Sequence, residues 1–202
     1  MPIVKNIVFI FLIFFTCSAF AIDYGGNFSE RSVLMRSIYG EPASNKEQKE
    51  LLASRKLNPS TKCLIDEIKK GNSDNVKLLL EAKVDPNKSY ISDYPIYVAS
   101  KYNKADIVKL LRESGAKLNM GFYSELYEAI KNKNSELAKY LIDEGANVNY
   151  RDSVTEHTIL YLALKNNMKD IASLLIQKGA RPDNQSVRYI QRHKLGDLIP
   201  SE

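Results

Sequence analysis

Residues 94–119 read YPIYVASKYNKADIVKLLRESGAKLN, and this stretch decides the fold. Two apolar runs flank a polar break around Asn103, and a Gly-Ala pair at positions 115 and 116 closes the second run. In that second run, residues 107–111 place apolar side chains at intervals of three and four, the spacing of a buried helical stripe. The stretch therefore predicts a helix, a tight turn, a second helix and a glycine stop.

The same arrangement recurs twice further along the chain. The Gly-Ala pair returns at positions 145 and 179, so that successive pairs lie 30 and 34 residues apart. A tyrosine and the alanine two residues after it repeat with the same spacings, at Tyr97 and Ala99, Tyr127 and Ala129, and Tyr161 and Ala163. Self-similarity with a period near 30 residues is typical of proteins built from stacked helical units.

This pattern resembles the ankyrin repeat, which opens with T-P-L-H-x-A-A, continues through a glycine-containing turn and E-V-V-x-L-L-L, and closes with Gly-Ala and Asn. Residues 94–100 fill the opening, 106–111 the middle and 115–119 the close. Three further copies, of which the last is weaker, run over 126–149, 158–183 and 61–87.

The resemblance implies an all-α solenoid of about four helix-turn-helix repeats with N- and C-terminal capping helices. The expected repeats cover about 60–91, 92–121, 122–153 and 154–183, followed by a C-terminal capping segment at 184–202. Residues 22–59 contain two expected helices, 28–39 and 46–57. They form either an N-terminal cap or a fifth, degenerate repeat, and the sequence leaves both alternatives open.

Two kinds of turn are expected to need a left-handed backbone. Glycine at 115, 145 and 179 suits the end of each second helix, whereas Lys83 holds that position in the first copy, at a cost of about 1 kcal/mol. We therefore expect the first copy to be strained or terminal. The turn between the paired helices holds Gly71, Asn103, Lys133 and Asn167, and because lysine tolerates this conformation less well, Lys133 leaves the turn register of the third repeat open.

The first 21 residues have the parts of a secretory signal peptide. Lys5 precedes an apolar run at 7–15, and Ala19 and Ala21 form a small-residue exit. The run is shorter than the roughly 20 apolar residues that span a bilayer, so we expect cleavage near Ala21, no membrane insertion afterwards, and a periplasmic or secreted protein. Lipidation of Cys17 is the alternative. After cleavage Cys63 has no cysteine to pair with, and it is expected to be a buried thiol.

Composition and motifs argue against catalysis and against nucleic-acid binding. The formal net charge is +5, with both signs mixed along the chain. His157 and His193 lie in no metal-ligand spacing, no nucleotide-binding motif is present, and we expect no enzyme activity, cofactor or metal. Neighbouring carboxylates such as Asp66 and Glu67 point about 100° apart on a helix and are expected on solvated faces.

The resemblance implies that partners bind at the loops between repeats and on the exposed, concave side of each first helix. The residues carried over to that surface are Tyr90, Asp93, Lys101, Tyr102, Met120, Phe122, Tyr123, Lys131, Tyr150, His157 and Lys165. Aromatic side chains offer contact area and the lysines would steer an acidic partner. Tyr97, Tyr127 and Tyr161 stand where the family has histidine and are expected to pack between repeats. Tyr94, Phe122 and Tyr123 could equally pack against the next repeat.

The expected function is an exported protein-protein interaction module that is monomeric on its own. Two roles fit about equally, an immunity or inhibitor protein and an accessory protein of an envelope enzyme, in a Gram-negative bacterium with an AT-rich genome. The alternative is a secreted, host-directed effector that binds eukaryotic proteins.

Overall fold

The computed structural model describes residues 45–198, and residues 1–44 and 199–202 lie outside the described part. The expected signal peptide, the alternative lipidation of Cys17 and the expected helix at 28–39 therefore fall outside it. The chain divides into two units, Met1–Arg55 and Lys56–Glu202. The first unit contributes one described helix, α3 (Asn45–Ser54), in the region expected to form the second N-terminal helix.

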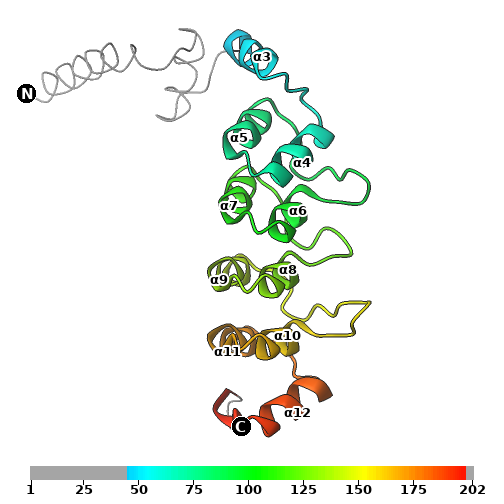
Figure 1. Ribbon diagram of the computed structural model, residues 1–202, viewed down its shortest axis with the longest axis vertical. Coiled ribbons are helices and arrows are strands. Elements are labelled where there is room, and N and C mark those ends of the chain that lie inside the picture. The colour runs from blue at the N-terminus through cyan, green and yellow to red at the C-terminus, as the bar shows by residue number, and fades with distance from the viewer. Residues whose placement is uncertain (1–44, 199–202) are drawn as a thin grey trace, which may run out of the picture. The chain divides into compact units, whose positions relative to one another are not determined.

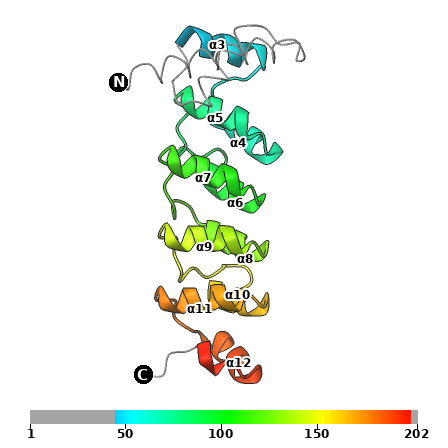
Figure 2. The same ribbon diagram turned by 90° about the vertical axis from the view of Figure 1, so that its left-hand side faces the viewer.

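The second unit is built from four antiparallel helix pairs, as the all-α ankyrin-repeat prediction requires (Figures 1 and 2). The pairs are α4 (Thr61–Lys70) with α5 (Ser73–Glu81), α6 (Pro95–Lys101) with α7 (Ala105–Glu113), α8 (Glu125–Lys131) with α9 (Ser135–Asp143), and α10 (Ile159–Lys165) with α11 (Lys169–Gln177). Helix α12 (Asn184–Arg192) and a short 3₁₀ turn, η1 (Gly196–Leu198), follow.

The helices form two parallel rows. The first helices α4, α6, α8 and α10 pack on one another in sequence, and α12 continues this row by packing on α10. The second helices α5, α7, α9 and α11 form the other row, and η1 packs on α11 (Figure 1). The connecting loops extend beyond the first-helix row, on the side away from the second helices.

The core repeats with the sequence. Ala99, Ala129 and Ala163 are fully buried, and so are leucines at equivalent positions of the four second helices, namely Leu79, Leu111, Leu141 and Leu175. Alanine allows the paired helices to approach closely, while the leucine fills the space between neighbouring pairs. Each pair therefore buries its apolar side chains against the next pair as well as within itself.

The turns between paired helices show the register of the third repeat, which Lys133 had left open. Gly71, Asn103, Lys133 and Asn167 all have a left-handed backbone, with φ of 79°, 55°, 56° and 59°. The third repeat thus keeps the turn register of the others, because Lys133 adopts the same conformation as the asparagines. At the end of α5, Lys83 has φ of 64°, where the later repeats have glycine, so the predicted strain lies in the first repeat.

A side-chain amide joins each repeat to the next along the loop side. Asn87 Nδ2 donates to the Gly115 carbonyl at 2.9 Å, and its Oδ1 accepts from the Lys117 amide at 2.7 Å. Asn149 bridges Gly179 and Arg181 in the same way, at 3.0 and 2.8 Å. Since each asparagine satisfies both a helix-end carbonyl and a loop amide, these bonds fix the offset between neighbouring repeats.

The last repeat replaces this asparagine with Asp183. Its Oδ1 accepts hydrogen bonds from the Ser186 amide and hydroxyl at 2.9 and 2.6 Å, which caps the N-terminus of α12. The carboxylate thereby starts a single helix in place of another loop. Ser124 and Thr158 cap α8 and α10 in the same manner, each accepting from the amide three residues later at 3.1 Å.

The expectation that Glu67 lies on a solvated face is wrong. Its side chain is buried, and the carboxylate accepts hydrogen bonds from Lys70 at 2.6 Å, Asn72 at 2.8 Å and Asn75 at 2.7 Å. Burial by itself raises the pKa of Glu67, but the hydrogen bonds from Lys70, Asn75 and Asn72 outweigh it, and the pKa is lowered. Glu67 occupies the position of the later alanines, so a polar contact between α4 and α5 replaces close apolar packing.

A second buried carboxylate, Glu125, lies in the opposite environment. It begins α8 at the position that Pro95 and Ile159 hold in neighbouring repeats, and it is 1% exposed. Its Oε2 has no hydrogen-bond partner among the described residues. Burial raises the pKa of Glu125 despite backbone hydrogen bonds from Glu125 and Asn119 that lower it.

These two acids predict opposite effects of the same substitution. At pH 7, Glu67→Gln should lower the free energy of unfolding by about 1 kcal/mol, because a charged acceptor is lost. Glu125→Gln should raise it by up to about 1 kcal/mol, because a neutral amide avoids the cost of burying a charged carboxylate. The contribution of Glu67 is present above its unfolded pKa and fades as the pH falls through its lowered folded pKa. The penalty of Glu125 is relieved as the pH falls through its raised folded pKa. Urea unfolding of both variants between pH 3 and 7 measures this, and equal signs at pH 7 would contradict it.

The asparagine side chain that bridges neighbouring repeats allows a separate prediction. Asn149→Ala should lower the free energy of unfolding by about 1 kcal/mol, because the Gly179 carbonyl and the Arg181 amide lose their partner. The control is Gln177→Ala on the exposed side of α11, which should change stability by less than about 0.5 kcal/mol. Thermal unfolding of both variants compares them, and an equal effect would show that the bridge does not hold the repeats.

Candidate binding surface

The candidate surface is supported by a ladder of tyrosines on the first-helix row. The Tyr97 ring of α6 stacks on Tyr123 from the following loop, with centroids 5.0 Å apart and planes at 20°. The Tyr127 ring of α8 meets Tyr150 from the next loop edge-on, at 5.7 Å. Each first-helix tyrosine thus holds the loop that leads into the next repeat.

The tyrosine hydroxyls add polar links between repeats. Tyr97 Oη donates to Glu128 Oε1 at 3.5 Å, and Tyr127 Oη lies 3.3 Å from Thr155 Oγ1. Burial and the Glu128 carboxylate raise the pKa of Tyr97, so its phenol stays protonated as a donor. With Tyr97 and Tyr127 only 6% and 7% exposed, the ladder is packing, as the sequence predicts.

The ladder continues to the C-terminal end of the stack. Tyr161 in α10 lies 4.8 Å from the His157 ring and meets Tyr189 of α12 edge-on at 6.1 Å. Tyr189 in turn stacks on His193 at 4.0 Å. His157 was predicted to be a partner-binding residue, and the structure places its half-buried ring in the ladder.

Three predicted site residues form a column of exposed lysines beside the ladder. Lys101, Lys131 and Lys165 end helices α6, α8 and α10, each four residues after the ladder tyrosine of its helix. Residues four apart share one face of a helix. The Lys101 Nζ accordingly lies 5.7 Å from the Tyr97 ring centroid, and the Lys131 Nζ lies 3.4 Å from Glu128 Oε2.

Tyr102 is exposed because it departs from the repeat pattern. The equivalent residues Asn132 and Asn166 donate to carbonyls of the preceding repeat, at Ser100 (3.1 Å) and Ile130 (2.8 Å). A tyrosine has no amide with which to make that bond, and the Tyr102 side chain is 45% exposed. The structure therefore leaves Tyr102 available to a partner, beside Lys101.

The loop tips carry the most exposed apolar side chains of the described residues. Ile91, Phe122 and Val154 are 80%, 91% and 88% exposed, one at each of the three long loops between repeats. The predicted residues Met120 and Tyr123 flank Phe122 and are 39% and 50% exposed. One exposed apolar side chain at each of three successive loops offers a partner apolar contact area along the loop side of the stack.

The first of these loops is a tight hairpin end. Tyr90 and Asp93 exchange backbone hydrogen bonds of 3.0 and 3.1 Å, so that the two residues between them form the tip. Ile91 and Ser92 both have a left-handed backbone, with φ of 49° and 65°. The predicted residues Tyr90 and Asp93 are half-buried at the base, and Ile91 is the side chain presented to solvent.

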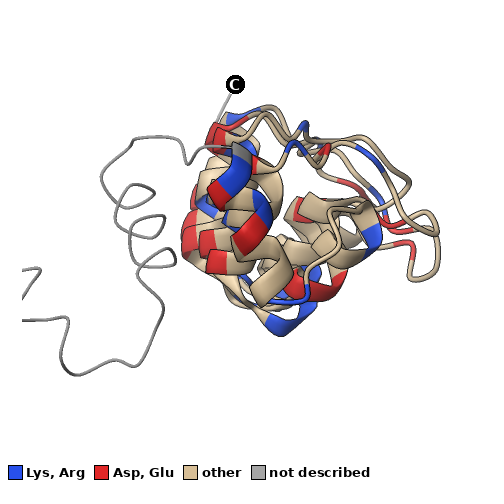
Figure 3. Cartoon of the chain, turned by 90° about the horizontal axis from the view of Figure 1, so that it is seen from above, with Lys and Arg blue, Asp and Glu red and all other residues tan. Residues whose placement is uncertain are grey.

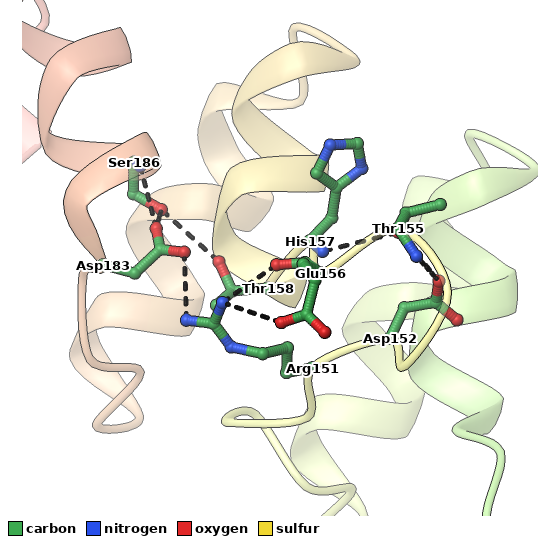
Figure 4. Close-up of polar contacts among 8 residues, drawn as sticks. All are labelled: Arg151, Asp152, Thr155, Glu156, His157, Thr158, Asp183 and Ser186. Atoms are coloured by element: carbon green, nitrogen blue, oxygen red, sulfur yellow. Dashed lines mark hydrogen bonds and ion pairs between the residues drawn. The ribbon is translucent and has the colours of Figure 1, made fainter.

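The loop between α9 and α10 is held by polar contacts to the last repeat (Figure 4). Arg151 donates to the Glu156 carbonyl at 3.0 Å and to Asp183 Oδ2 at 3.3 Å. Asp152 accepts from the Thr155 amide and hydroxyl, both at 2.8 Å, and these bonds lower the pKa of Asp152. The loop thus holds Val154 in a fixed position. In the sequence, the unequal spacing of the repeats indicated this loop but no single residue within it.

The described residues show little that would support chemistry. Among residues 45–198, no group of three His, Cys, Asp or Glu side chains is placed to hold a metal ion. The Cys63 thiol, predicted to be buried, is only half-buried, and burial raises its pKa. None of the helices in the described part is long and apolar enough to cross a membrane.

Comparison with known proteins identifies the repeats. A family described as "Ankyrin repeats (3 copies)" matches residues 64–152 and 123–186. The chain is 25% identical over 118 residues to the BRCA1-associated RING domain protein 1 of Caenorhabditis elegans, covering 56% of the chain and 17% of that protein. It is 36% identical over 90 residues to the putative ankyrin repeat protein FPV014 of fowlpox virus, covering 43% and 21%. The chain therefore spans about a fifth or less of these relatives.

The exposure of the tyrosines predicts which of them can be removed without loss of stability. Tyr102→Ala should change the free energy of unfolding by less than about 0.5 kcal/mol. Tyr97→Ala should lower it by about 3 kcal/mol, because it deletes a buried ring of the ladder. Circular dichroism during urea unfolding gives both values, and a collapse of helical content in Tyr102→Ala would place that side chain in the core.

Proposed function

The chain belongs to the ankyrin repeat family, and from this premise we propose that it binds a protein partner through its loop tips and the exposed side of its first helices. Ankyrin repeats are in general non-enzymatic interaction modules. The observation that carries the proposal is the set of three apolar tips, Ile91, Phe122 and Val154, held in water at successive repeats. Such side chains remove apolar surface from water only when a partner covers them.

The proposed setting is the bacterial envelope. Residues 1–21 have the composition of a cleavable export signal, and a binding module exported in this way would act in the periplasm or outside the cell. There it would serve as an immunity or inhibitor protein, or as an accessory protein of an envelope enzyme. The second candidate, a host-directed effector that binds eukaryotic proteins, rests on the same export signal and differs in where the protein ends up.

The cleavage of the chain and its location are tested in one experiment. The full chain, tagged at its C-terminus, is expressed in its own organism, and mass spectrometry determines its N-terminus and its location. We expect a chain that begins at Ile22 and is found in the periplasm. An uncleaved chain in the cytoplasm would contradict export, and a chain recovered from culture medium or host cells would favour the effector role.

Capture of a partner tests the surface itself. Proteins bound to the tagged chain are identified for the wild type and for Phe122→Ala, which removes an exposed ring and should leave stability unchanged within about 0.5 kcal/mol. The control is Lys139→Ala on the exposed side of α9. A stoichiometric partner that is retained by Lys139→Ala and weakened at least about tenfold by Phe122→Ala would support the loop tips as a contact. Equal retention by both variants would place the contact elsewhere.

A further inference from the structure

Charge is distributed unequally between the two helix rows. Each second helix carries a carboxylate in its first turn, at Asp74, Asp106, Glu136 and Asp170, together with at least one lysine, so that this row exposes charges of both signs. Figure 3 shows acidic and basic segments interleaved on the side where the second helices lie. Among the first helices α4, α6, α8, α10 and α12, the exposed charged side chains are basic, with Asp66 as the one exception.

The first-helix row is basic because its carboxylates other than Asp66 are buried. Glu67 and Glu125 are buried, and Glu128 is 8% exposed, with its carboxylate between the Tyr97 hydroxyl and Lys131. A partner that approaches this row therefore meets ammonium groups, beside the exposed ring of Tyr102. Carboxylates that would repel an acidic partner are withdrawn from the surface.

The ammonium groups stand in register with the repeats. Lys69, Lys101, Lys131 and Lys165 occupy the same position at the end of four successive first helices, and all four are exposed. Within the described residues, Lys69 and Lys165 make no ion pair. A lysine in the last turn of a helix also complements the helix dipole, which explains why this position is basic. The ammonium group nevertheless stays accessible to a partner.

We propose that the partner surface recognised by this face is an extended, acidic polypeptide segment lying along the first-helix row, across the column Lys69, Lys101, Lys131 and Lys165. This inference rests on the proposed protein-binding function and adds the chemistry of the partner. Packed helices lie about 8–10 Å apart, and a segment in the extended polyproline II conformation advances about 3.1 Å per residue with three residues per turn, so that every third side chain lies on the same side. Carboxylates at about every third residue of the segment would therefore meet successive lysines.

A polypeptide fits this face better than a nucleic acid does. The loops between repeats extend beyond the first-helix row (Figure 1), and two of them carry the exposed aliphatic side chains Ile91 and Val154, which offer apolar contacts for which a phosphate backbone has no counterpart. A polyanion large enough to wrap around the stack would meet carboxylates as well as lysines on the second-helix row. An extended segment that stays on the first-helix side meets the basic column alone.

The test is an NMR titration of the full chain, purified and isotope-labelled, at low ionic strength, which detects millimolar binding. The probe is a 12-residue peptide with Glu at positions 1, 4, 7 and 10 and Ser elsewhere. Amide shifts should concentrate in α4, α6, α8 and α10, and the affinity should fall as salt is added. A peptide with the same composition but four consecutive Glu residues should bind more weakly, and one with Lys in place of Glu should not bind.

The matched variants carry the same charge change in the same three repeats. Lys101→Gln/Lys131→Gln/Lys165→Gln should weaken binding of the spaced peptide about tenfold. Lys109→Gln/Lys139→Gln/Lys169→Gln on the second helices should leave it unchanged, and equal thermal stability of the two variants excludes a folding effect. Shifts confined to the second helices, equal losses in both variants, equal affinity for the clustered peptide, or tighter binding of oligothymidylate would overturn the proposal.

The outcome can be separated from that of the proposed function. If the captured partner is lost with Phe122→Ala but retained by Lys101→Gln/Lys131→Gln/Lys165→Gln, protein binding stands and the acidic-segment inference fails. If the spaced peptide binds along the first-helix row but the tagged chain captures no partner that depends on Phe122, the inference stands, and the loop-tip contact of the proposed function fails.

Discussion

A helix of seven residues cannot hold itself together in water, and this constraint shapes the whole stack. Helices α6, α8 and α10 have that length, well below the roughly 12–15 residues at which an isolated helix becomes marginally stable. Each is nevertheless buried along most of its length by a second helix and by the first helices on either side. Stability is therefore a property of neighbouring repeats, and whatever fixes their offset determines the fold.

The ends of the stack differ from its middle for the same reason. At the start, Glu67 replaces the buried alanine and Lys83 replaces the capping glycine, so the first pair is held by a charged hydrogen-bond cluster and a strained cap. At the other end, Asp183 replaces the bridging asparagine and starts α12. These departures from the repeat pattern thus change how the first pair is held together and which element follows the last pair.

The repeats could be predicted from the sequence because their pattern recurs. Contacts that occur in only one repeat could not be predicted in this way. The spacing of the three Gly-Ala pairs is enough to predict three helix pairs, and the resemblance over 61–87 adds the first. The burial of Glu67 depends on whether two amides turn toward it, which no spacing reveals. For the surface, Lys101 and Phe122 lie exposed where the resemblance placed them. His157 was assigned to the surface because it lies in a loop between repeats, although its ring packs on Tyr161. Val154 was missed because a lone valine in a polar loop carries no signal.

The division between the ladder and the exposed side chains has a consequence for binding. Ordering a flexible side chain at an interface costs about 0.5–1.5 kcal/mol, and a loop that is already fixed avoids part of that cost. Here the rings of Tyr97 and Tyr127 lie inside the protein, where they hold the loops that follow them. The side chains left outside, Ile91, Phe122 and Val154, are attached to a frame that need not rearrange. The buried rings of Tyr97 and Tyr127 therefore contribute to recognition by positioning the loops, without touching a partner.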